Sequence, residues 1–539
     1  MIYPTQYLIK SFSLVSIFLI SLMGCEEPPT FEKLNIPRTN LTQNNIIPRP
    51  LSVTADSSGF ALDTRTVFVN NTGNEEYDEV LNYLKQSVVS VSNFEKLSKE
   101  ENKRFIGRAI VFDKLSTEEQ KSEAYQLIIK EDTIFVSSNS AEGAFRAVQT
   151  LRQLIPEQPT DTLTDHSVYL IPTGEINDSP LYSHRGTMLD VSRHFFEVDE
   201  VKKYIDILAY YKINVLHLHL SDDQGWRIEI KSWPLLTEIG GKTEVGGGTG
   251  GFYTQEDYKE IVDYAAKHFI TIIPEIDMPG HTNAASLSYP ILNGNGKKLE
   301  AYTGMKVGFS TFDTRKDSVY VFIDDVIREI SAITPGPYFH IGGDESHSTD
   351  KDDYIYFVNK VEKIVQKYGK KMIGWDEIAT ADVDSSTISQ FWQNDKNALL
   401  AKNKNLKIIY SPAKKAYLDM KYSDSTKLGL RWAGFVPVDS SYNWAPSNYV
   451  KDISNKNILG VEAPLWSESI TNLKELQYLA FPRIIGIAEI GWSSEENRNW
   501  DEYRKRLGAQ FGFLKSNNVN FFEAPQVDWE RGETVKMID

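Results

Sequence analysis

The chain has 539 residues, and its 41% hydrophobic and 24% charged content is ordinary for a soluble globular protein. The length exceeds one average domain, so we expect two, one of them large. A formal charge of −16 argues against nucleic acid or an anionic membrane surface as a binding partner.

The first 24 residues are typical of a targeting segment. Lys10 precedes an apolar run over residues 14–23, which is too short to span a bilayer and suits a signal peptide. The run ends in Leu22-Met23-Gly24-Cys25, which resembles a bacterial lipobox with cleavage before Cys25 and lipid on its thiol. An ordinary signal peptide with an incidental cysteine is the alternative. The lipobox predicts a lipid-anchored protein of the bacterial cell envelope, periplasmic or on the outer-membrane surface.

Cys25 is the only cysteine in the chain, so neither an internal disulfide nor a cysteine-ligated metal site is possible. The residues that follow, 25–45, are polar and interrupted by prolines. This composition predicts a tether that holds the folded part away from the membrane.

Residues 46–175 predict a small α+β domain. We expect short strands at residues 66–69 and 109–112, a hairpin formed by residues 125–129 and 133–136, and an amphipathic helix over residues 141–154. Acidic, histidine-rich or glycine-rich motifs are not concentrated in this region. It is therefore predicted to support the rest of the chain.

Residues 180–525 predict a TIM (β/α)8 barrel. Eight apolar runs with the character of strands occur here, most of them followed by a helical pattern. A capping box from Thr254 to Asp257 opens one of these helices. The runs cover residues 186–191, 213–220, 270–276, 338–341, 371–375, 387–392, 406–410 and 458–464. A doubly wound open sheet is the alternative, but no Gly-x-Gly-x-x-Gly turn follows the first run.

Polar and aromatic residues follow nearly every predicted strand. In a barrel these positions meet at the carboxyl end, where barrel enzymes place their sites. The segments concerned are residues 190–194, 217–226, 274–281, 344–345, 375, 392, 417–419 and 466–468. One such residue could serve a structural salt bridge, but their recurrence predicts a polar pocket with aromatic walls.

The fourth predicted strand ends in two glycines followed by Asp344 and Glu345. The glycines allow a sharp turn and the close approach of a ligand. Two adjacent carboxylates repel when both are ionised, so one is held charged and the other is pushed towards its protonated form. Acid-assisted cleavage of a glycoside needs this arrangement. An exposed acidic pair in a loop is the alternative.

His217 and His219 alternate along the second predicted strand and therefore share a face. This spacing can bind a metal in barrel hydrolases. The further ligands of such a site do not follow in a matching pattern, which favours packed histidines that hydrogen-bond neighbouring strands. We expect no metal and no cofactor.

Seven motifs together resemble glycoside hydrolase family 20, the β-N-acetylhexosaminidases. The likeness begins at Ile47-Pro48-Arg49-Pro50 and extends over nearly the whole chain after the leader. It continues, in the order typical of the family, through DVSRHF, HLHLSDDQGWR, PEIDMPGH, HIGGDE, YLDM and LWSE. The resemblance implies an exo-acting, retaining enzyme that removes terminal β-linked N-acetylhexosamine, and it implies a glycan substrate.

The resemblance also implies a role for each site residue, with the substrate's 2-acetamido group serving as the nucleophile. Glu345 would be the general acid and base, while Asp344 and Tyr417 would hold the acetamide and stabilise an oxazolinium intermediate. The other implied positions bind or enclose the sugar or support Glu345. They are the walls Trp375, Trp392 and Trp466, the hydroxyl-binding residues Arg193, Asp419 and Glu468, and the supporting pair Asp222 and His281.

Two functions of other classes remain open from the sequence. A non-catalytic glycan-binding lipoprotein would be expected to have lost the acidic pair, which is intact here. A metal-dependent amidohydrolase would use His217 and His219, and a chelator would inactivate it.

Overall fold

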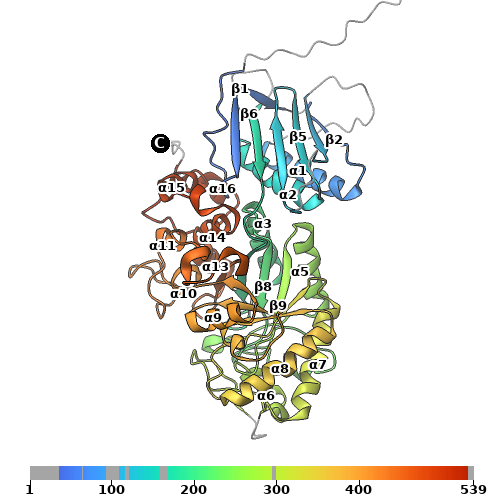
Figure 1. The fold of residues 1–539 in the computed structure, drawn as a ribbon, viewed down its shortest axis with the longest axis vertical. Helices are drawn as coiled ribbons and strands as arrows, with labels where there is room; N and C mark the ends of the chain where they lie inside the picture. The colour runs from blue at the N-terminus through green and yellow to red at the C-terminus, as the bar shows by residue number, and fades with distance from the viewer. Residues whose placement is uncertain are drawn as a thin grey trace, which may run out of the picture.

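The structure is a computed structural model that describes residues 36–63, 65–92, 108–115, 121–157, 159, 168–293 and 299–531. These residues form two domains stacked along the long axis of the molecule (Figure 1). Residues 1–24, Cys25 and the first part of the tether lie outside the described residues. Within the described part, every helix is too short or too polar to cross a membrane.

The smaller domain is a six-stranded mixed sheet with two helices, α1 (Glu75–Ser92) and α2 (Ala141–Leu154). The strand order is β1-β6-β4-β5-β3-β2. The strands are β1 (Ser52–Leu62), β2 (Val67–Asn70), β3 (Ala109–Asp113), β4 (Tyr125–Ile129), β5 (Thr133–Ser138) and β6 (Tyr169–Asp178). The predicted α+β class, hairpin and helix are confirmed. The first half of β1 is exposed and polar, so it lacks the apolar alternation that would have predicted it.

The larger domain is a closed barrel with strand order β10-β11-β12-β13-β14-β7-β8-β9, all pairs parallel. The strands are β7 (His184–Asp190), β8 (Val215–His219), β9 (Thr271–Glu275), β10 (Tyr338–His340), β11 (Lys371–Trp375), β12 (Ile388–Phe391), β13 (Lys407–Tyr410) and β14 (Ile458–Leu465). Each overlaps one of the eight predicted runs. The TIM barrel is therefore confirmed, and the open sheet is excluded.

Helices surround the barrel and continue beyond its last strand (Figure 1). Thr254 accepts a hydrogen bond from the amide of Asp257, and the Asp257 carboxylate accepts one from the amide of Thr254, which confirms the capping box of α5. The α-helices are α3 (Val198–Tyr210), α4 (Leu235–Glu238), α5 (Gln255–Lys267), α6 (Asn283–Ser288), α7 (Asp317–Ala332), α8 (Lys351–Lys367), α9 (Asp395–Asn403), α10 (Ala413–Ala416), α11 (Val438–Tyr442), α12 (Pro446–Tyr449), α13 (Leu473–Ala480), α14 (Arg483–Trp492), α15 (Trp500–Gly508) and α16 (Phe511–Ser516). Short 3-10 segments are η1 (Val245–Gly247), η2 (Pro290–Leu292), η3 (Asp376–Thr380), η4 (Asn455–Asn457) and η5 (Glu495–Asn497).

The lumen of the barrel changes character along its axis. Towards the amino ends of the strands, five aliphatic side chains pack together: Val215, Ile273, Ile373, Ile388 and Ile409. Beyond them, the inward-facing positions of β8, β9, β10 and β14 are buried histidines and glutamates. An apolar layer of branched residues is the usual filling of such a barrel. The polar layer therefore belongs to the end of the barrel where the site was predicted.

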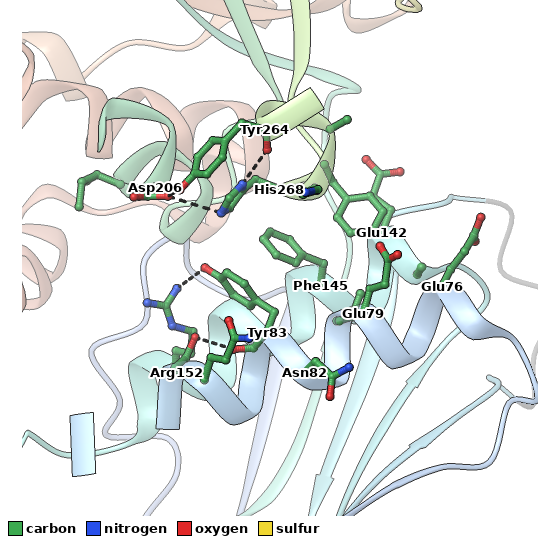
Figure 2. Close-up of a pocket in the computed structure, with 18 of the residues that line it drawn as sticks. Glu76, Glu79, Asn82, Tyr83, Glu142, Phe145, Arg152, Asp206, Tyr264 and His268 are labelled. Carbon is green, nitrogen blue, oxygen red and sulfur yellow. Dashed lines mark hydrogen bonds and ion pairs between the residues drawn. The ribbon is translucent and has the colours of Figure 1, made fainter. Parts of the chain in front are cut away.

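A hollow of about 1080 Å³ lies between the helices of the small domain and the amino-end side of the barrel (Figure 2). Polar groups on its wall pair with one another. Tyr264 donates to Asp206 at 2.6 Å, His268 Nε2 lies 3.4 Å from Asp206, and Arg152 donates to the Tyr83 hydroxyl at 2.8 Å. The hollow is part of the domain junction, at the end of the barrel away from the predicted site.

Candidate active site

The eleven residues expected in the site converge at the carboxyl ends of the barrel strands. Direct contacts link most of them. Glu468 joins through its electrostatic effect on Arg193, and Asp419 joins through the effect of Glu468 on it. The turn after β10 brings in the acidic pair, the loops after β7, β8 and β9 bring in polar groups, and the ends of β11 to β14 bring in aromatic and acidic groups.

The acidic pair stands on a turn that depends on glycine. Gly342, Gly343 and Glu345 have φ values of 66°, 96° and 45°. A Cβ atom on Gly342 would lie 1.9 Å from Asp277 Oδ1, so only glycine fits there. The amide of Gly343 donates to Asp277 Oδ1 at 3.1 Å. The Asp277 side chain therefore holds the turn, which places Glu345 in a strained left-handed conformation of the kind that clusters at functional sites.

Glu345 has the protonation behaviour of a general acid. Burial, followed by the charge of Asp344, raises the pKa of Glu345 to about 7, against the opposing effects of His281 and Arg193. Its side chain is 29% exposed, so a substrate can reach it. A carboxyl group with a pKa near neutrality can donate a proton and then recover it.

Asp344 presents an unused acceptor to the site. Its Oδ1 is buried without a hydrogen-bond partner among the described residues, and its Oδ2 lies 3.8 Å from His281 Nε2. Burial and the nearby charge of Asp344 raise the pKa of Asp277 well above its usual range. This favours the protonated form of Asp277. A buried carboxylate acceptor such as Asp344 Oδ1 is suited to an N–H donor from a ligand.

Four aromatic side chains enclose the space beside Asp344. Trp375 and Trp466 have ring centroids 5.8 Å apart, Tyr417 lies 6.4 Å from Trp466, and Trp392 stacks on Tyr417 at 6.4 Å. All four are buried. Their packing is rigid, since Trp375 Nε1 donates to a buried glutamate at 3.1 Å and Trp392 Nε1 donates to Glu377 at 3.1 Å. The result is an aromatic wall, and the charge of Asp344 acts on Tyr417 within it.

Asp419 and Glu468 supply more acceptors without protein donors. Both carboxylate oxygens of Asp419 and Oε2 of Glu468 are buried and unpaired among the described residues. Burial and the charge of Glu468 raise the pKa of Asp419 well above its usual range. Arg193 lies nearby, with its guanidinium 4.9 Å from the Trp466 ring centroid. Several hydroxyl groups on one ligand would satisfy this set, as ring hydroxyls of a sugar do.

Asp222 and His281 form a pair behind Glu345. His281 Nδ1 lies 3.1 Å from Asp222 Oδ1, and His281 Nε2 lies 3.8 Å from Glu345 Oε2. Arg193 Nη2 lies 2.8 Å from Asp222 Oδ2. Burial acts against the charge of His281, but Asp222, Asp277 and Asp344 together outweigh it and raise the pKa of His281 well above its usual range. A cation thus stands beside the acidic pair.

Comparison with known proteins places this geometry in a family. Residues 182–495 match the glycosyl hydrolase family 20 catalytic domain, and residues 43–179 match domain 2 of the same family. The chain belongs to glycoside hydrolase family 20. Family 20 membership agrees with the paired carboxylates and the enclosed aromatic wall, and it makes the chain a glycosidase.

Family 20 relatives cover most of the chain. A β-N-acetylhexosaminidase of Cellulomonas fimi is 40% identical over 412 residues, which is 76% of this chain and 82% of the relative. A β-hexosaminidase of Porphyromonas gingivalis is 34% identical over 93% of this chain and 67% of its own length. A solved Streptomyces coelicolor family 20 enzyme has a TM-score of 0.84 and 42% identity, covering 90% of this chain and 99% of that one. The Streptomyces plicatus enzyme, solved with thio-NAglucal, has a TM-score of 0.85 and 42% identity, covering 92% and 99%.

His217 and His219 are packed histidines that bond to neighbouring strands, as the sequence favoured. His217 Nδ1 pairs with Glu462 of β14 at 2.9 Å, and His219 Nδ1 pairs with Glu275 of β9 at 2.6 Å. His217, Glu275 and His340 also have ligand atoms close enough to share a metal ion. These groups instead pair with each other, and family 20 membership does not favour the amidohydrolase alternative.

Sequence reasoning assigned no role to three residues that shape the site. Trp432 packs at the rim, with its ring centroid 5.7 Å from Tyr417 and 6.0 Å from Trp392. Gln224 accepts from Arg193 Nε at 3.2 Å, and Glu377 anchors Trp392. Glu377 follows Trp375 closely in sequence, so proximity to a strand end could have revealed it. Trp432 lies in a loop far from any strand end, where no sequence pattern distinguished it.

Proposed function

We propose that this protein hydrolyses terminal, non-reducing β-linked N-acetylhexosamine, GlcNAc or GalNAc, from glycans or chitooligosaccharides. The observation that carries this proposal is the unpaired, buried Asp344 Oδ1 beside an aromatic wall and next to a carboxyl group with a pKa of about 7. An acetamide group offers one N–H, one carbonyl and one methyl. The charged acceptor, the Tyr417 hydroxyl and the tryptophan wall match these three features.

In the first step, Glu345 gives its proton to the glycosidic oxygen as the bond from that oxygen to the anomeric carbon breaks. The carbonyl oxygen of the substrate's 2-acetamido group forms a new bond to the same carbon, giving a cyclic oxazolinium ion. Asp344 accepts a hydrogen bond from the N–H of the oxazolinium ring and balances its positive charge, while the Tyr417 hydroxyl donates a hydrogen bond to the reacting oxygen. The walls hold the amide against the anomeric carbon, which gives a high effective molarity.

In the second step, Glu345 is a carboxylate and takes a proton from water. The water oxygen attacks the anomeric carbon, the bond from carbon to the ring oxygen of the oxazolinium breaks, and the acetamide is restored. Two displacements at one carbon retain the β configuration. The nearby cation of His281 stabilises Glu345 in its charged form between the two steps.

The pocket favours one terminal sugar over an internal one. Asp419, Glu468 and Arg193 offer several groups that bind hydroxyls, which suits a terminal sugar whose ring hydroxyls are free. A Streptomyces plicatus relative, 42% identical, was solved with GlcNAc as its product. We therefore assign exo cleavage.

A panel of aryl β-glycosides and defined oligosaccharides tests the proposal. Release of single N-acetylhexosamine units from the non-reducing end, with β product formed first, is the expected result. Internal cuts in long chitin as the main activity, or no activity on 2-acetamido glycosides, would contradict it.

We further propose that the enzyme is a lipoprotein of the bacterial cell envelope, anchored through Cys25. The Leu22-Met23-Gly24-Cys25 sequence and the polar tether after it support this. Cys25→Ala should move the protein from the membrane fraction to the soluble fraction with kcat and KM unchanged. If labelled fatty acid is not incorporated into the wild-type protein, the proposed lipid anchor is refuted.

A further inference from the structure

Glu275, the last residue of β9, is the centre of the polar layer in the barrel lumen. Its Oε2 accepts from His219 Nδ1 at 2.6 Å and lies 3.0 Å from His217 Nε2. Its Oε1 accepts from Trp375 Nε1 at 3.1 Å and lies 3.0 Å from His340 Nδ1. All five side chains are fully buried. One carboxylate therefore contacts side chains from β8, β10 and β11.

His219 connects this carboxylate to the acidic pair. Its Nδ1 faces Glu275, and its Nε2 lies 2.8 Å from Asp222 Oδ2. An imidazole between two carboxylates has both nitrogens placed as donors, which is the arrangement of an imidazolium. Asp222 then pairs with His281, and His281 Nε2 lies 3.8 Å from Glu345. Alternating acids and histidines thus run from the lumen to the catalytic acid.

The same chain continues away from the site to Glu462 of β14. This carboxylate accepts from Gln390 Nε2 at 2.8 Å, and it lies 2.9 Å from His217 Nδ1 and 2.8 Å from His184 Nε2. Glu462 is as buried as Glu275. It differs in position, since His217 and Glu275 separate it from the site.

A gain in stability does not explain the layer of buried histidines and glutamates. Replacing buried ion pairs by packed apolar residues is often neutral or stabilising, and the layer at the amino ends of the strands is filled in that apolar way. The charged layer occurs where the lumen meets the acidic pair and the tryptophan wall. Its position argues for a part in the reaction.

We propose that Glu275 is a positioning residue for the reaction: it holds His219 as a cation against Asp222, and it holds Trp375 in the wall of the pocket. Glu275 does not itself reach the substrate. It acts through the chain His219, Asp222 and His281 on Glu345. This inference rests on the proposed function for its kinetic readout, but not for the spectroscopic one given below.

The charges around Glu345 predict the effect of losing Glu275. Glu345 faces the acids Asp344 and Asp222 and the cations His281 and Arg193. His219 faces Glu275, Asp222 and Asp277. Burial acts against the charge of His219, but the two carboxylates outweigh it and raise its pKa well above the usual range. Without the charge of Glu275, His219 loses its proton more readily. Asp222 is then less neutralised, and the pKa of Glu345 rises.

The kinetic test compares Glu275→Gln with Glu462→Gln. Both changes remove one buried charge of the same layer and keep the shape of the side chain. The substrate is a β-linked disaccharide of N-acetylglucosamine, whose poor leaving group needs the Glu345 proton. We expect Glu275→Gln to lower kcat about tenfold, which is less than the ~10²–10⁴-fold due to general acid catalysis itself. The basic limb of its kcat/KM profile should move up by about half a pH unit, the scale of a modest change in one neighbouring charge.

Glu462→Gln should displace that limb by clearly less. An unmoved limb in Glu275→Gln, or equal displacement in the two variants, overturns the proposal. Profiles are normalised within each variant, so a lower folded fraction does not affect the comparison.

A measurement on the wild type keeps the test open if Glu275→Gln fails to fold. In protein labelled with ¹⁵N-histidine, the ring nitrogens of His219 should remain doubly protonated at pH 8, where exposed histidines are neutral. The His219 signals are assigned by their absence from the spectrum of His219→Gln, and loss of the doubly protonated His219 signal by that pH overturns the proposal. A wild type without hexosaminidase activity would instead refute the proposed function, and the ¹⁵N result would still decide the charge of His219.

Discussion

Two buried acidic clusters of this protein differ in whether their acceptors are filled. At the domain junction, Asp178 is fully paired. Its Oδ2 accepts from the Tyr125 hydroxyl at 2.6 Å and from Lys212 Nζ at 3.1 Å, and its Oδ1 accepts from Trp492 Nε1 at 2.8 Å and from the amide of Leu51 at 3.0 Å. Each donor comes from the protein itself.

At the carboxyl ends of the barrel strands, buried carboxylates are left open. Asp344 Oδ1, both oxygens of Asp419 and Glu468 Oε2 have no donor among the described residues. A buried acceptor without a donor costs about 1–3 kcal/mol, and more when it is charged. A closed cluster therefore joins two domains, whereas an open one is the expected state of a site whose donors arrive with the substrate.

The largest expected effect comes from changing Glu345 of the acidic pair. Glu345→Gln removes the proton that a poor leaving group needs, so hydrolysis of a disaccharide should fall by ~10²–10⁴-fold. A nitrophenyl glycoside scarcely needs that proton, and its first step should be spared. Steady-state rates across a series of leaving groups measure the contrast.

Asp344→Asn is the matched change on the neighbouring residue. It removes the charge that balances the oxazolinium ring, so good and poor leaving groups should slow alike, by ~10²–10³-fold. Added azide should trap the intermediate in the Glu345 variant, because azide needs no base. The same leaving-group dependence in both variants would refute this division of roles.

Breaking the closed cluster should affect stability and leave the chemistry alone. Asp178→Asn leaves Lys212 buried without its counter-charge, and breaking a buried pair in this way costs about 3–5 kcal/mol of unfolding free energy. Denaturant unfolding measures the loss, and KM and the pH profile of the folded enzyme should not change. Glu523→Gln is the control, since its partners Lys515 and Arg531 are at least half exposed and such a pair contributes about 0–1 kcal/mol.

The opposite outcome is expected where the cluster is open. Asp419→Asn relieves a buried, unpaired carboxylate, so stability should rise by about 0.5–2 kcal/mol. The same change removes an acceptor for a sugar hydroxyl, so kcat/KM should fall by roughly 10–100-fold, as for one hydrogen bond to a charged group. Thermal unfolding and kinetics on one preparation measure both. A less stable Asp419→Asn would remove the distinction between open and closed clusters.

The same distinction separates the features of the fold and site that the sequence predicts from those it does not. The eight barrel strands are apolar runs with turn signals at their ends, so local pattern identifies them, and motifs at the strand ends identify the residues that face the pocket. Residues that face the pocket can therefore be predicted from the local sequence. The pairing of buried groups cannot: Glu275 stands in a predicted motif, but its four partners come from other strands. The polar half of β1 and the rim residue Trp432 were missed for the same reason, since their contacts are set by tertiary packing.

The smallest expected effect is a pH dependence due to Glu345 in the open cluster. Burial and Asp344 raise the pKa of Glu345 from 4.5 to about 7, so the acid form persists to neutrality and kcat/KM on a poor leaving group should fall as pH rises through about 7. The contribution of Glu345 to the free energy of unfolding should also fall as pH rises. Between pH 4.5 and 7 the folded state binds more protons at Glu345 than the unfolded state does, so its contribution to stability falls as pH rises across that window. Glu345→Gln should abolish this part of the slope, whereas Asp178→Asn should leave it in place. An unchanged slope in Glu345→Gln would assign the titration to another group.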